Sequence, residues 1–375
     1  MTLGGDERTR FLVVSALMLP AMMHVFACGN SDESGSGSTV QATHESGTPT
    51  GSSEPDTTLN ATLSHSVSGE TDAQSSTSFG GASSDAESTA SGGDVAPGSC
   101  DRFDTVERNV DVYTQADAQQ LMGLQCVVSD LDIYSLPADP VVDLSPFTAL
   151  HVVGEDLAVN LLGLPDLHGF DALARVGGDL VLGGEGPDIP GCLVNPGSLT
   201  LDGLDALEQL EGLSICGLDA RGQSVAPLQS IAALDAALDG ELERVSLRYL
   251  PALASIDALS GVTHLDGLVL IDLPQVTDLA PLGELGGMIS MTMWRTGVAD
   301  LHGLESVIAL DDRLDISFND QLVTLDGLDA LASVGALYIT NNAMLPQTEA
   351  EAFAATIDVA AEVVICGNLD GEPCA

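Results

Sequence analysis

The feature that most constrains the fold is a short strand-like unit, aliphatic at its first and third positions, that recurs along residues 131–366. Its ten pairs are Leu131/Ile133, Leu157/Val159, Leu180/Leu182, Leu213/Ile215, Val245/Leu247, Leu268/Leu270, Ile289/Met291, Leu314/Ile316, Leu337/Ile339 and Val363/Ile365. Successive units begin 21 to 33 residues apart. This period predicts a coil with one strand per turn, in which neighbouring strands form a parallel sheet and the aliphatic side chains stack into one core.

A second phrase separates the strands and contains a glycine. Its copies are Asp202-Gly203-Leu204, His302-Gly303-Leu304 and Asp326-Gly327-Leu328, with looser versions at His168-Gly169-Phe170 and Asp257-Ala258-Leu259. We predict that the glycine turns the return segment of each coil. Asn319, Asn342 and Asn368 occupy the sixth position of the last three strand units, and Trp294 takes the same place in the unit that begins at Ile289.

This pattern resembles leucine-rich repeats, and the Gly-Gly-Asp-Leu turn at residues 177–180 is similar to the receptor L-domain type found in bacterial surface lipoproteins. The resemblance covers residues 121–368. It implies a solenoid of about ten short parallel strands with few helices, and it carries no catalytic residues to transfer.

The N-terminus has the features of an export signal. Residues 11–27 form an apolar run that is short for a membrane span, and Val25-Phe26-Ala27-Cys28 resembles a bacterial lipobox, which implies cleavage before Cys28 and acylation of its thiol. Simple secretion and an uncleaved anchor are the alternatives. We predict a signal peptide at 1–27, a disordered Ser/Gly/Thr-rich acidic tether at 28–99 and the solenoid at 100–375.

Six further cysteines indicate disulfide bonds in an exported chain. Sequence alone allows 15 pairings of six cysteines. Nearest-neighbour pairing, which suits the repeat best, gives Cys100–Cys126, Cys192–Cys216 and Cys366–Cys374. A metal site is the rival interpretation, but no CxxC or His-rich spacing supports it.

Three helices are expected beside the strands. Thr114 and Asp117 predict a capping box for a helix to about Met122, and Thr348 with Glu351 predicts one for a helix to about Ile357. Residues 227–238 carry apolar side chains at helical spacing and predict an amphipathic helix. A Gly/Pro-rich insertion at 183–198 holds Cys192.

Motifs for chemistry are scarce. The chain has 10 Arg plus Lys against 56 Asp plus Glu, which excludes a basic nucleic-acid surface. No nucleotide, zinc-protease or hydrolase motif is present, so we expect no enzyme, cofactor or metal. For His168 and His302, turn capping is favoured over a ligand role. The acidic groups at Asp311, Asp312, Asp315 and Asp320 follow no calcium-loop spacing, so we favour a solvated surface over a Ca²⁺ site.

The second and fourth strand positions should face outward. Most of these positions hold small or mildly polar residues, so the candidate binding face consists of the exceptions and their neighbours: Arg248, Val269, Ile271, Thr292 and Trp294. The sixth position of Trp294, however, favours a core role. We therefore expect a monomeric, lipid-anchored protein of the bacterial outer membrane or cell surface that binds an extracellular protein or glycan. The alternatives are a structural envelope spacer without a ligand and, more remotely, an enzyme or a calcium-binding surface protein.

Overall fold

A computed structural model describes residues 100, 103–134, 138–160, 164–183, 200–217 and 228–374. The chain divides into two units, Met1–Ala86 and Glu87–Ala375. The predicted signal peptide, Cys28 and the tether lie outside the described residues, as does Cys192 with its insertion. All that follows concerns the second unit.

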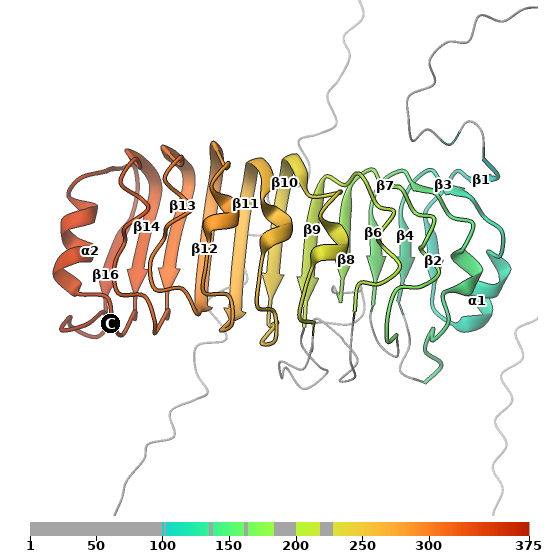
Figure 1. The fold of residues 1–375 in the computed structure, drawn as a ribbon, viewed down its shortest axis with the longest axis horizontal. Helices are drawn as coiled ribbons and strands as arrows, with labels where there is room; N and C mark the ends of the chain where they lie inside the picture. The colour runs from blue at the N-terminus through green and yellow to red at the C-terminus, as the bar shows by residue number, and fades with distance from the viewer. Residues whose placement is uncertain are drawn as a thin grey trace, which may run out of the picture. The chain divides into compact units, whose positions relative to one another are not determined.

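A parallel sheet of twelve strands runs along this unit (Figure 1). From the N-terminal edge its strands are β2 (Val110–Val112), β4 (Leu131–Ile133), β6 (Leu157–Val159), β8 (Asp179–Leu182), β9 (Gly212–Cys216), β10 (Asp239–Arg248), β11 (Gly261–Leu273), β12 (Gly287–Thr296), β13 (Ala309–Ser317), β14 (Ser333–Thr340), β15 (Asp358–Val359) and β16 (Val363–Cys366), the last two both pairing with β14. The fold is therefore a repeat solenoid, as the sequence predicted. The edge strand β2 is an additional turn that the sequence analysis missed.

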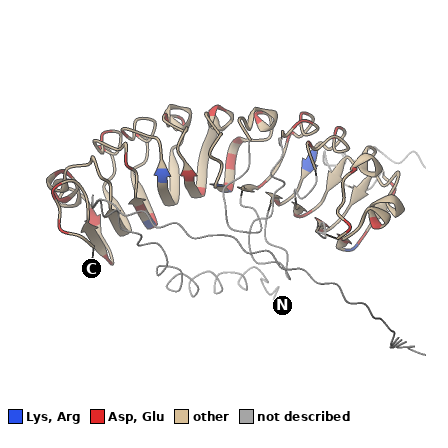
Figure 2. Ribbon diagram, turned by 90° about the horizontal axis from the view of Figure 1, so that it is seen from below, with Lys and Arg blue, Asp and Glu red and all other residues tan. Residues whose placement is uncertain are grey.

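A second parallel sheet of four two-residue strands lies near the N-terminal end of the unit. Its members are β1 (Thr105–Val106), β3 (Cys126–Val127), β5 (Val152–Val153) and β7 (Arg175–Val176). This sheet is not among the predicted elements. In Figure 2 the strands of the main sheet follow the inner side of the curved coil, and the return segments follow its outer side.

The return segments use two kinds of turn. In the first, Gly169, Gly203, Gly303 and Gly327 adopt φ between 106° and 123°, and each lies against a backbone carbonyl of the preceding turn. In the second, a 3₁₀ helix makes the turn at η2 (Ser145–Phe147), η3 (Ala232–Leu234), η4 (Asp257–Leu259) and η5 (Ala280–Leu282). The predicted role of the glycine phrase is thus confirmed, and its looser copy at Ala258 is a 3₁₀ turn instead.

The amphipathic helix predicted for residues 227–238 is wrong. Leu228, Ile231, Leu234 and Leu238 are buried as expected, but the described part contains only the three-residue η3. Leu228, Ile231 and Leu234 are three residues apart. This spacing suits a 3₁₀ turn, which has three residues per turn, as well as it suits an α-helix. The segment follows the return pattern of its neighbours.

Helix α1 (Gln115–Gln120) covers the N-terminal end and has the predicted capping box. Thr114 accepts from the backbone N–H of Asp117, and the Asp117 carboxylate accepts from the backbone N–H of Thr114. The helix covers the open end that a repeat coil leaves. The predicted Cys100–Cys126 disulfide is also present and joins the segment before β1 to β3.

The C-terminal end has a helix and a disulfide, but its predicted cap is wrong. Helix α2 spans Gln347–Ala354, with Pro346 as its N-cap, so Thr348 lies inside the first turn and makes no capping hydrogen bond. The Gln347 backbone N–H donates instead to the Leu369 carbonyl at 3.0 Å. The predicted Cys366–Cys374 disulfide joins the last strand to the tail.

One strand register differs from the prediction. Met291, not Ile289, pairs with Leu268 and Leu314, so Met291 and Met293 are the inward pair of β12. Ile289 is 38% exposed. Consequently Trp294 occupies the fourth, outward position rather than the inward sixth, and Thr292 occupies the second position rather than the fourth.

The sixth positions of the C-terminal turns form a buried polar ladder. Asn342 donates through Nδ2 to the Ile316 carbonyl at 2.9 Å, and its Oδ1 accepts from the Asn319 backbone N–H at 2.9 Å. Asn319 accepts in the same way from Thr296, and Asn368 from Asn342. The three Asn at the sixth positions thus form a continuous ladder, and the corrected register adds Thr296 to it.

Candidate functional site

The outward face of the main sheet has three rows of side chains. We number each strand from its first inward residue, which is position one, so the residue before it belongs to the zero row. The zero row includes Arg244, Gly267, Ser290 and Arg313. The second row includes Ser246, Val269, Thr292, Asp315 and Tyr338, and the fourth row includes Cys216, Arg248, Ile271, Trp294, Ser317 and Thr340. Neighbours in a row lie on adjacent strands, about 4.8 Å apart. All five predicted binding-face residues belong to these rows.

The middle of this face holds a group that we call the central patch: Arg244, Arg248, Val269, Ile271, Thr292 and Trp294. Arg248, Ile271 and Trp294 follow one another on β10, β11 and β12, and all three are half-buried. Nε of Arg248 and Nε1 of Trp294 are both buried, and neither has a hydrogen-bond partner among the residues that the structure describes. Two donors in this state have lost water without gaining an acceptor, which is costly unless a ligand supplies one.

Aromatic side chains with a polar group gather on this face. The chain has four Tyr and one Trp. Tyr338 and Trp294 take outward positions on β14 and β12. The other three tyrosines directly follow β2, β4 and β10: Tyr113, Tyr134 and Tyr249. The Tyr113 and Tyr134 rings stack with centroids 5.9 Å apart. Tyr and Trp are enriched at binding hot spots, and here none of these five residues belongs to the buried core.

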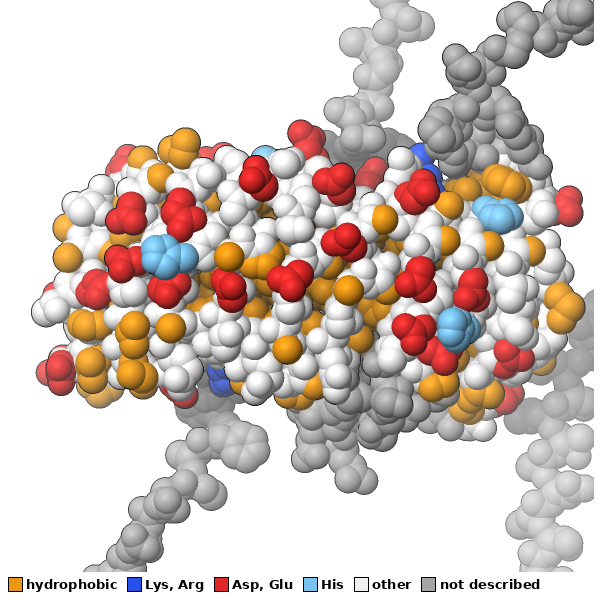
Figure 3. All heavy atoms as spheres, viewed as in Figure 1, with side chains coloured by type: hydrophobic (Ala, Val, Ile, Leu, Met, Phe, Trp, Pro, Cys, Tyr) orange, Lys and Arg blue, Asp and Glu red, His pale blue; other side chains and the backbone are white. Residues whose placement is uncertain are grey.

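Charge is distributed unevenly along the same face. Over β2 to β8 the outward positions carry five carboxylates and no cation: Asp111, Asp130, Asp132, Asp156 and Asp179. Over β9 to β14 they carry three Arg and one Asp: Arg244, Arg248, Arg313 and Asp315. Figure 3 is viewed from the side of the return segments, and on that opposite face acidic side chains are spread across the surface. The central patch is therefore cationic within a strongly acidic protein.

The carboxyl groups on the outward positions of β2 to β8 lie close together, and their pKa values are raised where they are partly buried. Partial burial raises the pKa of Asp132 to about 6, opposed by a hydrogen bond from Tyr134 and reinforced by the charges of Asp130, Asp111 and Asp156. Burial likewise raises the pKa of Asp179, with Asp156 adding to the effect and Arg244 opposing it. At neutral pH the charge of Asp132 is therefore carried at the expense of folding stability.

We expect Asp132→Asn to raise the free energy of unfolding at pH 7.5 by about 1 kcal/mol. One pKa unit corresponds to about 1.4 kcal/mol, which solvent screening reduces at a partly exposed site. The folded pKa of about 6 lies above the ordinary value of 3.8, so the gain should shrink as the pH falls from above 6 to 4. Urea unfolding at pH 7.5 and pH 4.0 measures it, and an equal gain at both pH values would contradict the raised pKa.

The carboxyl edge of the sheet has its own row. Tyr249, Asp272, Arg295, Phe318 and Asn341 follow the fourth row and all adopt φ between 51° and 60°. Arg295 lies 3.4 Å from an Asp272 carboxylate oxygen, and its guanidinium stands 5.4 Å from the Phe318 ring centroid. This interaction occupies Arg295, whereas Arg244 and Arg248 form no salt bridge within the described residues.

The two return-phrase histidines cap their own turns. Nδ1 of His168 lies 2.9 Å from Asp171, and Nδ1 of His302 lies 2.9 Å from Glu305. The hydrogen bond to the acid raises the pKa of each histidine. Both carboxylates also accept the N–H of the phrase glycine, Gly169 or Gly303. The arrangement agrees with turn capping.

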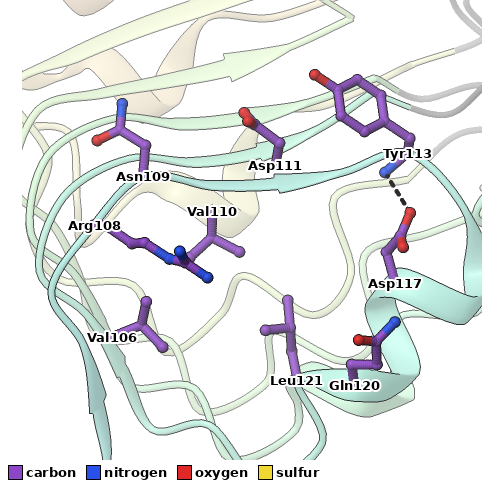
Figure 4. Close-up of a pocket in the computed structure, with 9 residues that line it drawn as sticks. All are labelled: Val106, Arg108, Asn109, Val110, Asp111, Tyr113, Asp117, Gln120 and Leu121. Carbon is purple, nitrogen blue, oxygen red and sulfur yellow. Dashed lines mark hydrogen bonds between the residues drawn. The ribbon is translucent and has the colours of Figure 1, made fainter. Parts of the chain in front are cut away.

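A hollow of about 470 Å³ opens at the N-terminal end (Figure 4). It is lined by Val106, Arg108, Asn109, Val110, Asp111, Tyr113, Asp117, Gln120 and Leu121. In Figure 4 the Tyr113 backbone N–H points to Asp117, a contact that belongs to the α1 cap. None of the predicted binding-face residues lies here.

No group of three or more possible metal ligands occurs among the described residues. None of the described helices has the length and apolar character that a membrane span needs. Cys216 is disulfide-bonded, but its predicted partner Cys192 lies outside the described residues. No family model matches the chain, and no curated protein matches it in sequence.

Proposed function

We propose that this chain is an exported, lipid-anchored surface protein whose solenoid presents its outward sheet face to a protein or glycan ligand. The observation that carries the proposal is the placement of every Tyr and the single Trp on or directly beside that face. In a chain with only 3% aromatic residues, a purely structural coil has no need of this distribution. We further propose that the coil is of the leucine-rich type, and that it acts by binding and not by catalysis.

The central patch supports a binding role more specifically. Arg248 and Trp294 combine the residue types most common at hot spots with buried donors that lack an acceptor. Ile271 between them supplies apolar contact area. The alternative function, an envelope spacer without a ligand, explains the acidic surface and the proposed tether but offers no reason for these unsatisfied groups.

An array of glycans and extracellular proteins tests the proposal, probed with the full chain and with the double variant Arg248→Glu, Ile271→Asp. We expect saturable binding by the wild type, weakened at least about 30-fold in the variant, which corresponds to the 2 kcal/mol scale of hot spots. Equal binding by both proteins would move the ligand elsewhere. No saturable binding by the wild type would favour the spacer.

The anchor has a separate test at Cys28. Because Cys28 follows Ala27 at the end of the apolar run, Cys28→Ser should abolish incorporation of a labelled fatty acid and release the protein from membranes. Labelling and mass spectrometry of the mature N-terminus measure both effects. If the wild type takes up no label, or if its mature chain does not begin at residue 28, the chain is not a lipoprotein.

A further inference from the structure

We propose that the central patch binds an acidic glycan, a chain of sugars bearing carboxylates, laid across strands β10 to β12 with a carboxylate on Arg248 and a sugar ring against Trp294. This inference rests on the proposed binding function and narrows the ligand to one chemical class. Three features of the patch carry it: its local charge, its unsatisfied donors and its position inside the sheet.

The local charge selects an anionic group. Arg244 and Arg248 both lie on β10, at the zero and fourth rows, about 13 Å apart along the strand. Neither forms a salt bridge within the described residues. The fourth row of β9 to β14, which holds Arg248, contains no acid, and the second row contains Asp315, whereas the exposed Glu243 directly precedes Arg244. At physiological ionic strength charges are screened over about 8 Å, so a bound group responds to these guanidinium groups more than to the net charge of the chain.

The donors select oxygen acceptors. Arg248 Nε and Trp294 Nε1 can only donate, and both are buried without an acceptor in the described part of the chain. An Arg guanidinium binds a carboxylate through two parallel hydrogen bonds, of which Nε–H commonly supplies one. The indole ring offers an apolar face to the C–H groups of a sugar, while its N–H can donate to a ring or hydroxyl oxygen.

The spacing of the patch favours an extended ligand. Arg248 and Trp294 are separated by one strand, so their backbones lie roughly 10 Å apart, with Ile271 between them. Gly267 adds no side chain to the zero row, where the Ser290 hydroxyl lies beside it, and Thr292 lies beside Val269 in the second row. A ligand that runs across the strands therefore meets a carboxylate site, an apolar segment, hydroxyl groups and an aromatic ring.

The position inside the sheet disfavours a peptide. An extended peptide gains its affinity mainly from backbone hydrogen bonds to an open sheet edge. Strands β10, β11 and β12 are paired on both sides, so their backbones have no such groups to offer. Recognition here must come from side chains alone, which suits hydroxyl-rich and carboxylate-rich sugars.

Titration of the purified full chain with uronate tetrasaccharides tests this inference. Trp294 is the only Trp in the chain, so tryptophan fluorescence reports on the patch, and calorimetry detects binding without a spectral change. The probes are tetramers of galacturonate, glucuronate and mannuronate, with tetragalactose as the neutral control and tetraglutamate as the peptide control. We expect at least one uronate to bind and to alter the fluorescence, and both controls to bind at least tenfold more weakly.

Matched variants locate the contact. Arg248→Gln should weaken the uronate at least tenfold, and Arg248→Lys, which keeps the charge but loses the planar fork, should also weaken it. Arg108→Gln removes an exposed cation outside the patch and should change nothing. Circular dichroism melts show that each variant is folded. If Arg248→Gln does not fold, calorimetry on Trp294→Phe, again with at least tenfold weaker binding expected, takes its place.

Several results would overturn the inference. If tetragalactose bound as tightly as the uronates, the patch would not recognise a carboxylate. If tetraglutamate bound as tightly, the ligand class would be an acidic peptide and not a glycan. If none of the three uronates bound, the proposal of an acidic glycan would be wrong. In each of these cases the array could still find a ligand that the double variant loses, so the binding function would stand while its acidic-glycan form fell.

Discussion

Gly327→Ala is expected to destabilise the solenoid by about 2 to 5 kcal/mol. Gly327 has a φ of 109°, and a Cβ added there would overlap the Leu301 carbonyl of the preceding turn. The conformational cost of positive φ is about 1 to 2 kcal/mol, and overpacking in a closed site adds about 1 to 3 kcal/mol. Urea unfolding followed by circular dichroism measures the loss.

Gly240→Ala is the matched control. Gly240 also has positive φ, at 85°, but no atom lies within 4 Å of an added Cβ. Its substitution should therefore cost only about 1 to 2 kcal/mol, the conformational part alone. A Gly327→Ala variant no less stable than Gly240→Ala would show that the glycine phrase is not held against the preceding turn, and the stacking of the return segments would need revision.

Asn342→Ala is expected to cost about 3 to 5 kcal/mol. Asn342 is fully buried, and its side chain joins three turns through hydrogen bonds to Ile316, Asn319 and Asn368. Truncation strands the Ile316 carbonyl and the Asn319 backbone N–H in the core, and each buried unsatisfied group costs about 1 to 3 kcal/mol. Because stability in a solenoid is shared between neighbours, we expect the C-terminal turns to open first.

Hydrogen exchange read along the chain distinguishes that local opening from global loss. The control is Asn109→Ala, which removes an exposed Asn that donates to Asp130 at 2.6 Å and should cost less than about 1 kcal/mol. A similar small cost for Asn342→Ala would mean that the buried ladder does not hold these turns together.

The strand positions could be predicted because a period of two in apolar residues is local information. The register of β12 could not, since Ile289/Met291 and Met291/Met293 both satisfy the pattern. Pairing with Leu268 and Leu314 decides between them, and that choice depends on neighbouring turns. The two-residue misassignment placed Trp294 inside the coil when it belongs outside.

The composition of the candidate site also depends on strand register, which is set by neighbouring turns. Arg248, Val269 and Ile271 were correctly placed outward, because their strands have a single possible frame. Arg244 was missed because it precedes the first inward residue of its strand, and only the pairing of β10 with β9 and β11 brings it into an outward row. The cationic character of the patch within an acidic chain became visible only after all the registers were fixed.

Return segments were the least predictable part. Leucines three residues apart fit both a 3₁₀ turn and an α-helix, so the short η3 was expected as a long helix. The strands of the small sheet have two residues each, too few for any period to be recognised. The helix α2 began one residue earlier than its apparent capping box because Gln347 bonds to the C-terminal tail, which no local pattern records.

The central patch is expected to bind a ligand and not to hold the fold together. The most direct test measures affinity and melting temperature on the same samples of three proteins, using whichever ligand the array identifies. They are the wild type, the double variant Arg248→Glu, Ile271→Asp, and a control with the same chemical changes at exposed positions outside the patch, Arg108→Glu with Ile308→Asp.

We predict that the patch variant loses at least about 30-fold in affinity, that the control keeps wild-type affinity, and that all three proteins melt within a few degrees of one another. The opposite pattern, a patch variant that unfolds early or that binds as tightly as the wild type, would contradict the claim.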